Sequence, residues 1–199
     1  GRHYWFAENL LENGYEPTIF CANTRHNSGN IIAIPKGKYL RMTTENIPFV
    51  FVKTINYRGN GIQRINNMLM FAWNLFSLAK EYSRNFGKPD VILASSVHPL
   101  TLVAGIKIAR KFGVPCICEI RDLWPESLVA YGFLKRSSII AKMLYQGEKW
   151  IYKNADSIIM TWEGGKDYIR DMGWDDQVDL NKVKHINNGV SVEKFDRDS

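Results

Sequence analysis

The stretch VILASSVHPLTLVAGIKIARKFGVPCICEI, residues 91–120, contains two short apolar strands and the helix between them. Residues 91–94 and 114–120 carry almost no charge, which is typical of strands buried on both faces. Residues 99–112 begin with a proline and are followed by Gly113, the residue types that open and close a helix. This order of strand, helix and strand predicts two neighbouring parallel strands.

The same alternation extends in both directions from this unit. We expect helices over 2–13, 62–86, 139–153 and 164–172, and strands over 16–22 and 157–160. In the irregular segment 23–60, residues 31–34 and 39–42 could pair with each other, and 49–53 reads as a core strand. The chain is therefore predicted to be an α/β domain with a doubly wound, Rossmann-like parallel sheet.

Composition sets further bounds. With 199 residues and 45% hydrophobic content, the chain can bury one core, so we expect one domain. Its three cysteines are too few for a disulfide framework, and Cys116 and Cys118 should pack as small hydrophobes on one face of a strand. The most apolar helical stretch, 68–79, is too short to cross a bilayer, and we expect a cytoplasmic protein.

The net charge of +6 is concentrated in one segment. Residues 25–80 hold eight lysines and arginines (25, 36, 38, 41, 53, 58, 64 and 80) and one acid, Glu45. This predicts a positive face that could attract phosphates, nucleic acid or anionic lipid, although a solvated basic surface without a partner also explains it. No stacking or helix-insertion motif for nucleic acid accompanies it, and we expect no nucleic-acid partner.

Ligands of doubly wound sheets bind beyond the carboxyl ends of the strands. After 91–94 come Ser95, Ser96 and His98, which lie directly before a helix and could hold a phosphate or a sugar hydroxyl, although simple helix capping explains them equally well. After 157–160, Gly164-Gly165-Lys166 lacks the spacing of a phosphate-binding loop and better fits a tight turn; Lys166 stays a candidate for substrate binding.

The segment CEIRDLWPES, residues 118–127, places four charges and a Trp-Pro after a buried strand. Such charges must be paired or solvated in a cleft, because an isolated charge is costly to remove from water. Arg121 could pair with Glu119, Asp122 or Glu126 and merely pin the loop. The group as a whole predicts a functional site, with Arg121, Asp122 and Glu126 as catalytic candidates and Trp124 as a substrate contact.

Several enzyme signatures are absent from the sequence. It contains no GxSxG, HExxH, protein-kinase or dinucleotide-binding pattern, which argues against hydrolase, metalloprotease, kinase and dehydrogenase or epimerase functions. The cysteines and histidines do not form a zinc-ligand pattern, so we expect neither a metal nor a cofactor.

Over RDLWPES, residues 121–127, the chain resembles the amino-terminal domains of family 4 retaining glycosyltransferases with the GT-B fold, particularly those that build bacterial surface polysaccharides. The resemblance covers nearly the whole length. Its other markers are Gly1-Arg2-His3, similar to the end of a glycine-rich loop; Asp90-Val91-Ile92 with Ser95-Ser96; and Asn188-Gly189-Val190 followed by Phe195, similar to an interdomain linker.

The resemblance assigns different roles to different parts of the protein. Residues 1–186 would be the Rossmann-like acceptor-side domain, 187–199 the start of the linker, and Gly1, Arg2 and His3 would lie near the donor phosphates. A first strand would precede the chain, and a domain that holds the nucleotide-sugar would follow it, so we expect the fragment alone to be inactive.

Many members of the family carry a histidine where this chain has Arg121. The resemblance is compatible with a role for Arg121 in stabilising anionic oxygens, and for Asp122 or Glu126 in orienting the acceptor. The reaction that it implies is a retaining sugar transfer, for which we expect no metal. The basic segment would suit a polyprenyl-diphosphate-linked acceptor, or another glycan, with the protein peripheral on the inner face of the cell membrane. The alternative is a non-catalytic module that binds anionic lipid or polymer through this face.

Overall fold

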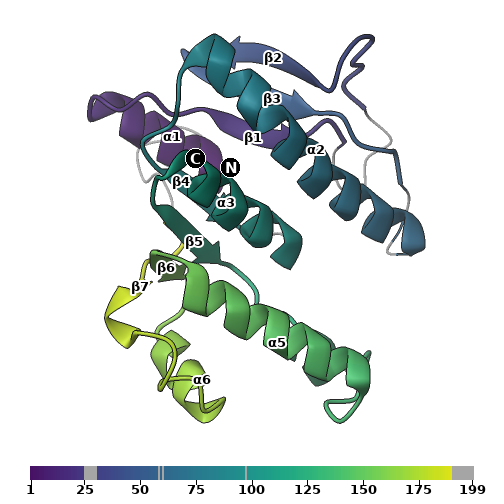
Figure 1. The fold of residues 1–199 in the computed structure, drawn as a ribbon, viewed down its shortest axis with the longest axis vertical. Helices are drawn as coiled ribbons and strands as arrows, with labels where there is room; N and C mark the ends of the chain where they lie inside the picture. Colours follow the sequence, from purple (N-terminus) through teal and green to yellow (C-terminus); the bar gives the residue numbers. More distant parts are fainter. Residues whose placement is uncertain (25–30, 58, 60, 97, 190–199) are drawn as a thin grey trace, which may run out of the picture.

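A computed structural model of the chain describes residues 1–24, 31–57, 59, 61–96 and 98–189 (Figure 1). Its elements are, in order, α1 Arg2–Glu12, β1 Ile19–Ala22, β2 Tyr39–Thr44, β3 Ile47–Val52, α2 Ile62–Phe86, β4 Ile92–Ser95, α3 Pro99–Phe112, β5 Cys116–Ile120, α4 Glu126–Ala130, α5 Ile139–Asn154, β6 Ser157–Met160, α6 Gly165–Asp171, the 3-10 helix η1 Leu180–Lys182 and β7 Val183–His185. The predicted helices and most predicted strands are present within a few residues of their expected bounds. Three short elements, α4, η1 and β7, were not predicted.

Strands β4, β5, β6 and β7 form a parallel sheet in that order. This confirms the α/β class and the parallel sheet predicted from residues 91–120. Cys116, Cys118 and Ile120 of β5 are buried on one face of the sheet, as expected for small apolar residues two apart on a strand. The helices α3 and α5 pack against this face, and their apolar side chains complete the main core.

A second sheet has the order β1-β3-β2, with β1 parallel and β2 antiparallel to β3. The predicted pairing of 39–42 with 31–34 is therefore wrong, because Tyr39–Thr44 pairs with Ile47–Val52 instead. The turn between them contains Glu45 and Asn46, both with positive φ. Two successive residues of this kind match the twist of a tight hairpin, which explains why β2 folds back on β3.

Helices cover both faces of this second sheet, which is the doubly wound arrangement. On one face, Val50 and Val52 of β3 pack with α2. On the other, Tyr4 of α1 stacks on Phe49 with 6.5 Å between the ring centroids. Figure 1 shows α2, α3 and α5 along one side of the strands, and α2 packs on α3, which packs on α5.

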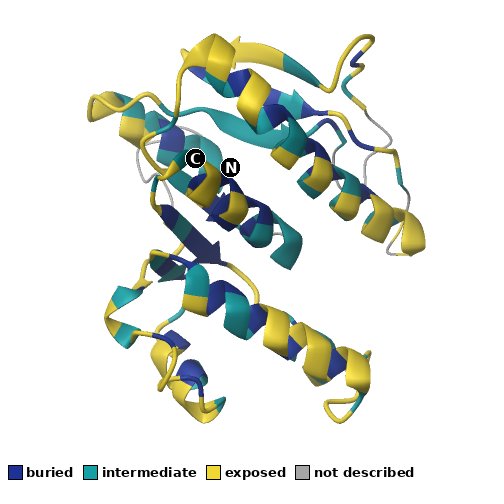
Figure 2. Ribbon diagram, in the orientation of Figure 1, coloured by how far each residue is buried: buried dark blue, intermediate teal, exposed yellow. Residues whose placement is uncertain are grey.

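The first half of α5 is largely exposed, since only Ala141 and Tyr145 are buried there (Figure 2). In α2 the buried residues are instead spread along the helix, at positions 67, 71, 74, 78 and 82. In the described part of the chain, no helix has both the length and the apolar content needed to cross a bilayer.

Two glycines inside helices provide a test of the packing. A Cβ added at Gly105 of α3 would lie 2.5 Å from Cβ of Ala94, whereas one added at Gly147 of α5 would have no atom within 4 Å. We expect Gly105→Ala to lower the free energy of unfolding by about 1–3 kcal/mol through overpacking. Gly147→Ala should leave it unchanged or raise it by up to about 1 kcal/mol, because alanine favours helix. Urea denaturation of both variants measures the difference; equal effects would contradict the α3–β4 packing.

Candidate functional site

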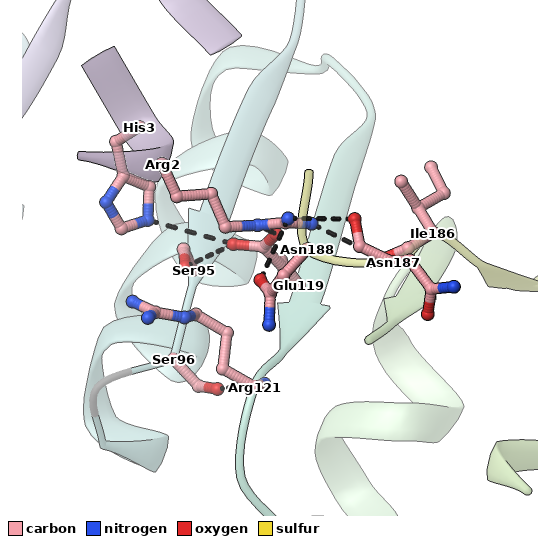
Figure 3. A network of polar contacts seen from close by, with 9 residues as sticks. All are labelled: Arg2, His3, Ser95, Ser96, Glu119, Arg121, Ile186, Asn187 and Asn188. Atoms are coloured by element: carbon pink, nitrogen blue, oxygen red, sulfur yellow. Dashed lines mark hydrogen bonds and ion pairs between the residues drawn. The ribbon is translucent and has the colours of Figure 1, made fainter. Parts of the chain in front are cut away.

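The carboxyl ends of β4, β5, β6 and β7 meet at one edge of the parallel sheet, where ligands bind in folds of this class. Ser95 closes β4, Glu119 lies one residue before the end of β5, and residues 186–188 follow β7. The first turn of α1 reaches the same edge (Figure 3). Segments far apart in the sequence are therefore brought together here.

Glu119 is at the centre of this edge, and its side chain is wholly inaccessible to solvent. One carboxylate oxygen accepts a hydrogen bond from Arg2 Nε at 2.6 Å, and the other accepts one from Ser95 Oγ at 2.5 Å. His3 Nε2 lies 3.7 Å from the second oxygen, within ion-pair range but too far for a hydrogen bond. Figure 3 shows these three side chains converging on the carboxylate.

Burial by itself would raise the pKa of Glu119, because it disfavours the charged form. The contacts with His3, Ser95 and Arg2 outweigh that effect and lower its pKa to about 2. The carboxylate is therefore ionised at neutral pH and stabilised by its partners. Glu119 is a structural anchor, whereas its place in the sequence suggested only a possible partner for Arg121.

Arg2 also joins this cluster to the segment after β7. Its Nη1 atom donates to the carbonyl of Asn187 and to Oδ1 of Asn188, each at 3.0 Å, and Nη2 donates to the carbonyl of Ile186 at 3.4 Å. Figure 3 shows the guanidinium between Glu119 and this segment. Of the linker marker predicted around residues 187–199, Asn188 and Gly189 are described, while Val190 and Phe195 lie outside the described residues.

Ser96 holds the loop after β5 and does not cap α3. Its hydroxyl accepts a hydrogen bond from the backbone N–H of Arg121 at 2.9 Å, and its own N–H donates to the carbonyl of Glu119 at 2.9 Å. Ser96 is buried, so both bonds are shielded from water. The backbone position of Arg121 is thereby set by the neighbouring strand.

His98 occupies the N-cap position of α3 without a side-chain capping bond, and its ring is buried against Phe71 of α2. The hydroxyl of Thr101 lies 3.3 Å from its Nε2 atom. Burial, together with the charge of Arg64, lowers the pKa of His98 to about 4, so the ring is neutral at pH 7. The structure thus places His98 in a helix interface, and no contact among the described residues joins it to the Glu119 cluster.

Arg121 and Asp122 are exposed beyond the end of β5. Among the described contacts, neither forms an ion pair, so the alternative in which Arg121 pairs with Glu119, Asp122 or Glu126 is not what the structure shows. In Figure 3 the guanidinium of Arg121 extends toward the side on which His3 lies. A free cation and a free carboxylate at the end of a central strand can meet an anionic group and a hydroxyl, respectively.

Two cavities adjoin this loop, and Trp124 lines both. The smaller, of about 20 Å³, is bordered by Ser96, Asp122 and Glu148; the larger, of about 140 Å³, is almost entirely apolar. A volume of about 20 Å³ is enough for one water molecule. Asp122 and Trp124, both predicted from the sequence as site residues, therefore line the same small cavity.

Glu126 is separate from the Glu119 cluster and begins the short helix α4. Its carboxylate accepts hydrogen bonds from Arg136 Nη2 and Tyr145 Oη, each at 2.5 Å. Burial opposes ionisation of Glu126, but these two partners bring its pKa below the usual value. Its bonds tie α4 to α5, so its described contacts are structural.

Lys166 lies in the first turn of α6, beyond β6, and is exposed. Gly165 beside it packs tightly on Met160, where an added Cβ would lie 2.1 Å from Met160 Sδ. The Gly-Gly pair therefore makes the tight strand-to-helix turn that the sequence favoured. No described contact brings Lys166 to the Glu119 cluster. Gly1, predicted with Arg2 and His3, is the exposed N-cap residue of α1.

Glu148 is a buried acid that was not predicted from the sequence. It lies on the buried face of α5 and accepts hydrogen bonds from Tyr152 Oη at 2.7 Å and Tyr168 Oη at 2.8 Å. Burial dominates over these bonds and raises the pKa of Glu148 to about 7. In the sequence, Glu148 lies at helical spacing between Tyr145 and the pair Ile151 and Tyr152, which face the core. This spacing places its carboxyl group on the buried face of the helix.

The structure describes only part of the basic segment, residues 25–80, because Arg25 and Arg58 lie outside the described residues. Lys38 donates to Ser77 Oγ at 3.1 Å, and the guanidinium of Arg41 lies over the ring of Phe86. These two cations thus have contacts within the protein. Among the described residues, no group of three His, Cys, Asp or Glu side chains is placed to hold a metal ion.

The sequence pattern of Glycosyltransferase Family 4 matches residues 4–194, nearly the whole chain. The chain belongs to glycosyltransferase family 4. A curated relative, the probable glycosyltransferase WbjE of Pseudomonas aeruginosa, is 27% identical over 100 residues, which cover 50% of this chain and 23% of WbjE.

Two solved structures of sucrose-phosphate synthase from Thermosynechococcus elongatus share the fold of this family 4 domain. One superposes with a TM-score of 0.62 at 16% identity, over 97% of this chain and 44% of that one. The other gives a TM-score of 0.59 at 14% identity, over 98% of this chain and 88% of that one. The chain has the Rossmann-like fold of a GT-B domain, and it spans less than half of WbjE and of the first synthase structure.

The Arg2–Glu119 pair can be tested by removing its cation. Arg2→Ala removes the cation paired with the buried carboxylate of Glu119 and should lower the free energy of unfolding at pH 7 by about 3–5 kcal/mol. The loss should shrink as the pH falls toward about 2, because without Arg2 the buried carboxyl of Glu119 takes up its proton at a higher pH than in the wild type.

The control is Arg170→Ala, which removes an exposed pair with Asp167 and should cost at most about 1 kcal/mol. Denaturant titrations across this pH range measure both effects. Equal losses for the two variants at pH 7 would contradict the anchoring role of Glu119.

Proposed function

We propose that this domain binds the acceptor in a retaining glycosyltransferase that moves a sugar from a nucleotide-sugar to a glycan or lipid-linked precursor of a surface polysaccharide. Membership of family 4 supports the class of reaction. The observation that carries the assignment is the exposed pair Arg121 and Asp122 at the carboxyl end of β5, beside a cavity that Asp122 lines. The donor would be held chiefly by a further domain of the full-length protein.

In this reaction the bond between the sugar C1 atom and the diphosphate oxygen breaks, and the acceptor hydroxyl oxygen bonds to C1 on the same face. The hydroxyl proton passes to the departing diphosphate. Negative charge therefore grows on phosphate oxygens, where the guanidinium of Arg121 can stabilise it. The carboxylate of Asp122 can accept a hydrogen bond from the acceptor hydroxyl and orient it. No step requires a histidine at position 121.

A membrane location for the acceptor is supported by the outer face of α2. Five large apolar residues are exposed there at helical spacing: Ile62, Ile65, Leu69, Trp73 and Phe76, with Ile62 and Trp73 each 75% exposed. The same helix carries Arg64, Lys80 and Arg84. An apolar stripe with basic neighbours fits shallow insertion into an anionic lipid surface, and we propose peripheral binding at the inner face of the cell membrane.

Replacing the proposed catalytic pair tests the function. In the full-length protein, Arg121→Ala should lower kcat/KM for release of nucleoside diphosphate from a panel of nucleotide-sugars by about 100-fold or more, and Asp122→Ala should also lower it. Both residues are exposed, so the stability of the fold should change little. Arg170→Ala, another exposed arginine, is the control. Wild-type turnover in both variants would contradict the proposed roles of Arg121 and Asp122.

Co-sedimentation with vesicles tests the membrane surface. The wild-type chain should bind vesicles that contain phosphatidylglycerol at low salt, and Trp73→Ser should weaken binding about tenfold because the indole no longer inserts. Tyr15→Ser, an exposed aromatic outside α2, is the control. Salt-sensitive vesicle binding by a full-length protein without transferase activity would instead favour the non-catalytic module.

A further inference from the structure

Asp122 and Glu148 line the same small cavity, although they come from different elements. Asp122 lies in the loop after β5 and is exposed, whereas Glu148 lies on α5 and is only 5% exposed. The cavity has a volume of about 20 Å³. The proposed reaction gives Asp122 a role and leaves Glu148 without one. A buried acid thus lies next to the carboxylate that is proposed to orient the acceptor.

The described partners of Glu148 include no cation. Tyr152 Oη donates to its Oε1 atom at 2.7 Å, and Tyr168 Oη donates to its Oε2 atom at 2.8 Å. None of the described ion pairs involves Glu148. Burial without a cation makes the charged form costly, and the pKa of Glu148 rises to about 7. Glu148 is therefore mostly protonated just below neutral pH.

The surroundings of Glu148 are neutral or negative on every side. On α3 they are apolar, because Glu148 also lines the larger cavity, an apolar groove between α3 and α5. Arg136 is engaged by a hydrogen-bonded ion pair with Glu126. The titratable groups around Glu148 are Asp122 after β5, Glu126 of α4, Tyr145 and Tyr152 of α5, and Tyr168 of α6.

The acid proton of Glu148 needs an acceptor other than the tyrosines, because both of them donate to its carboxyl oxygens. The small cavity leads to such an acceptor, since Asp122 lines it. A volume of about 20 Å³ has room for one water molecule, and a buried water makes about three hydrogen bonds. A water molecule there would accept a hydrogen bond from Glu148 and donate one to Asp122.

Ser96 provides the third partner for a water molecule in this cavity. Its hydroxyl oxygen accepts a hydrogen bond from the backbone N–H of Arg121 at 2.9 Å, and in the described contacts this hydroxyl acts only as an acceptor. Its hydrogen can therefore donate into the cavity, which Ser96 also lines. The cavity thus has both the room and the polar groups that a bridging water requires.

We propose that Glu148 is a positioning residue for Asp122: its carboxylic acid donates a hydrogen bond, through one water molecule in the small cavity, that holds the Asp122 carboxylate toward the acceptor hydroxyl. The inference rests on the proposed function and adds to it a support for the acceptor-orienting group that depends on a proton. When Glu148 ionises, the donor is lost and two negative charges border one cavity. Asp122 is then repelled, so its position changes with pH.

NMR titration of the side-chain carboxyl carbons in the 199-residue chain tests this link. Besides its own titration, the Asp122 signal should shift in the pH range in which Glu148 titrates, near pH 7. Glu148→Gln keeps a neutral donor but cannot ionise, so it should remove this second shift. Tyr168→Phe removes a hydrogen bond that lowers the pKa of Glu148, so it should move the second shift to higher pH.

The control is Glu163→Gln, which changes an exposed acid that lines neither cavity and should leave the second shift of Asp122 unchanged.

The pH profile of the full-length protein gives a second readout. In the wild type, kcat/KM for release of nucleoside diphosphate should fall above about pH 7, because Glu148 no longer donates. Glu148→Gln should remove this fall. Glu148→Leu fills the space but donates nothing, and it should lower kcat/KM about tenfold below pH 7. A purely structural glutamate would affect stability in these variants and leave the shape of the pH profile unchanged.

Two results would overturn the role of Glu148. They are an Asp122 signal in the wild type that does not shift where Glu148 titrates, and a fall of kcat/KM above pH 7 that persists in Glu148→Gln. The NMR titration needs no substrate. An inactive full-length protein whose Asp122 signal still follows Glu148 would therefore contradict the proposed transferase while leaving the link between the two acids in place.

Discussion

The arrangement of the sheet edge depends on one buried charge, the carboxylate of Glu119. A carboxylate that solvent cannot reach is costly unless its oxygens are paired, and here Arg2 and Ser95 pair them. Arg2 then uses its remaining donors on residues 186–188. The first helix, the central strand and the segment after the last strand are thus fixed to one another around a single charge.

The loop that carries Arg121 and Asp122 follows from this anchor. Ser96, next to Ser95, holds the backbone N–H of Arg121, so the position of the loop is set by the same two strands that hold Glu119. With Glu119 paired to Arg2, the side chains of Arg121 and Asp122 are left exposed. A binding site benefits from exposed polar groups on a rigid backbone, because less conformational entropy is lost when a ligand binds.

Two buried glutamates near this edge show how partners decide a protonation state. Glu119 has a guanidinium beside it and a pKa of about 2, whereas Glu148 has tyrosine hydroxyls and a pKa of about 7. Burial raises the pKa of both groups; at Glu119 the contacts with His3, Ser95 and Arg2 outweigh it, whereas at Glu148 the two tyrosine hydroxyls do not, and the charge of Glu126 raises the pKa further. The first is therefore a fixed anion that organises the chain, and the second can be neutral beside an apolar groove.

The sequence by itself determined the α/β class, the longer helices and the parallel strands other than β7, because periodicity, glycine stops and apolar runs act locally. It also singled out Arg121, Asp122 and Trp124 from charges placed after a buried strand. Only the tertiary structure decided that β2 pairs with β3, that Glu148 is buried and that Arg2 meets Glu119, 117 residues away. Such long-range pairs depend on how the elements pack, which no local pattern of residues encodes.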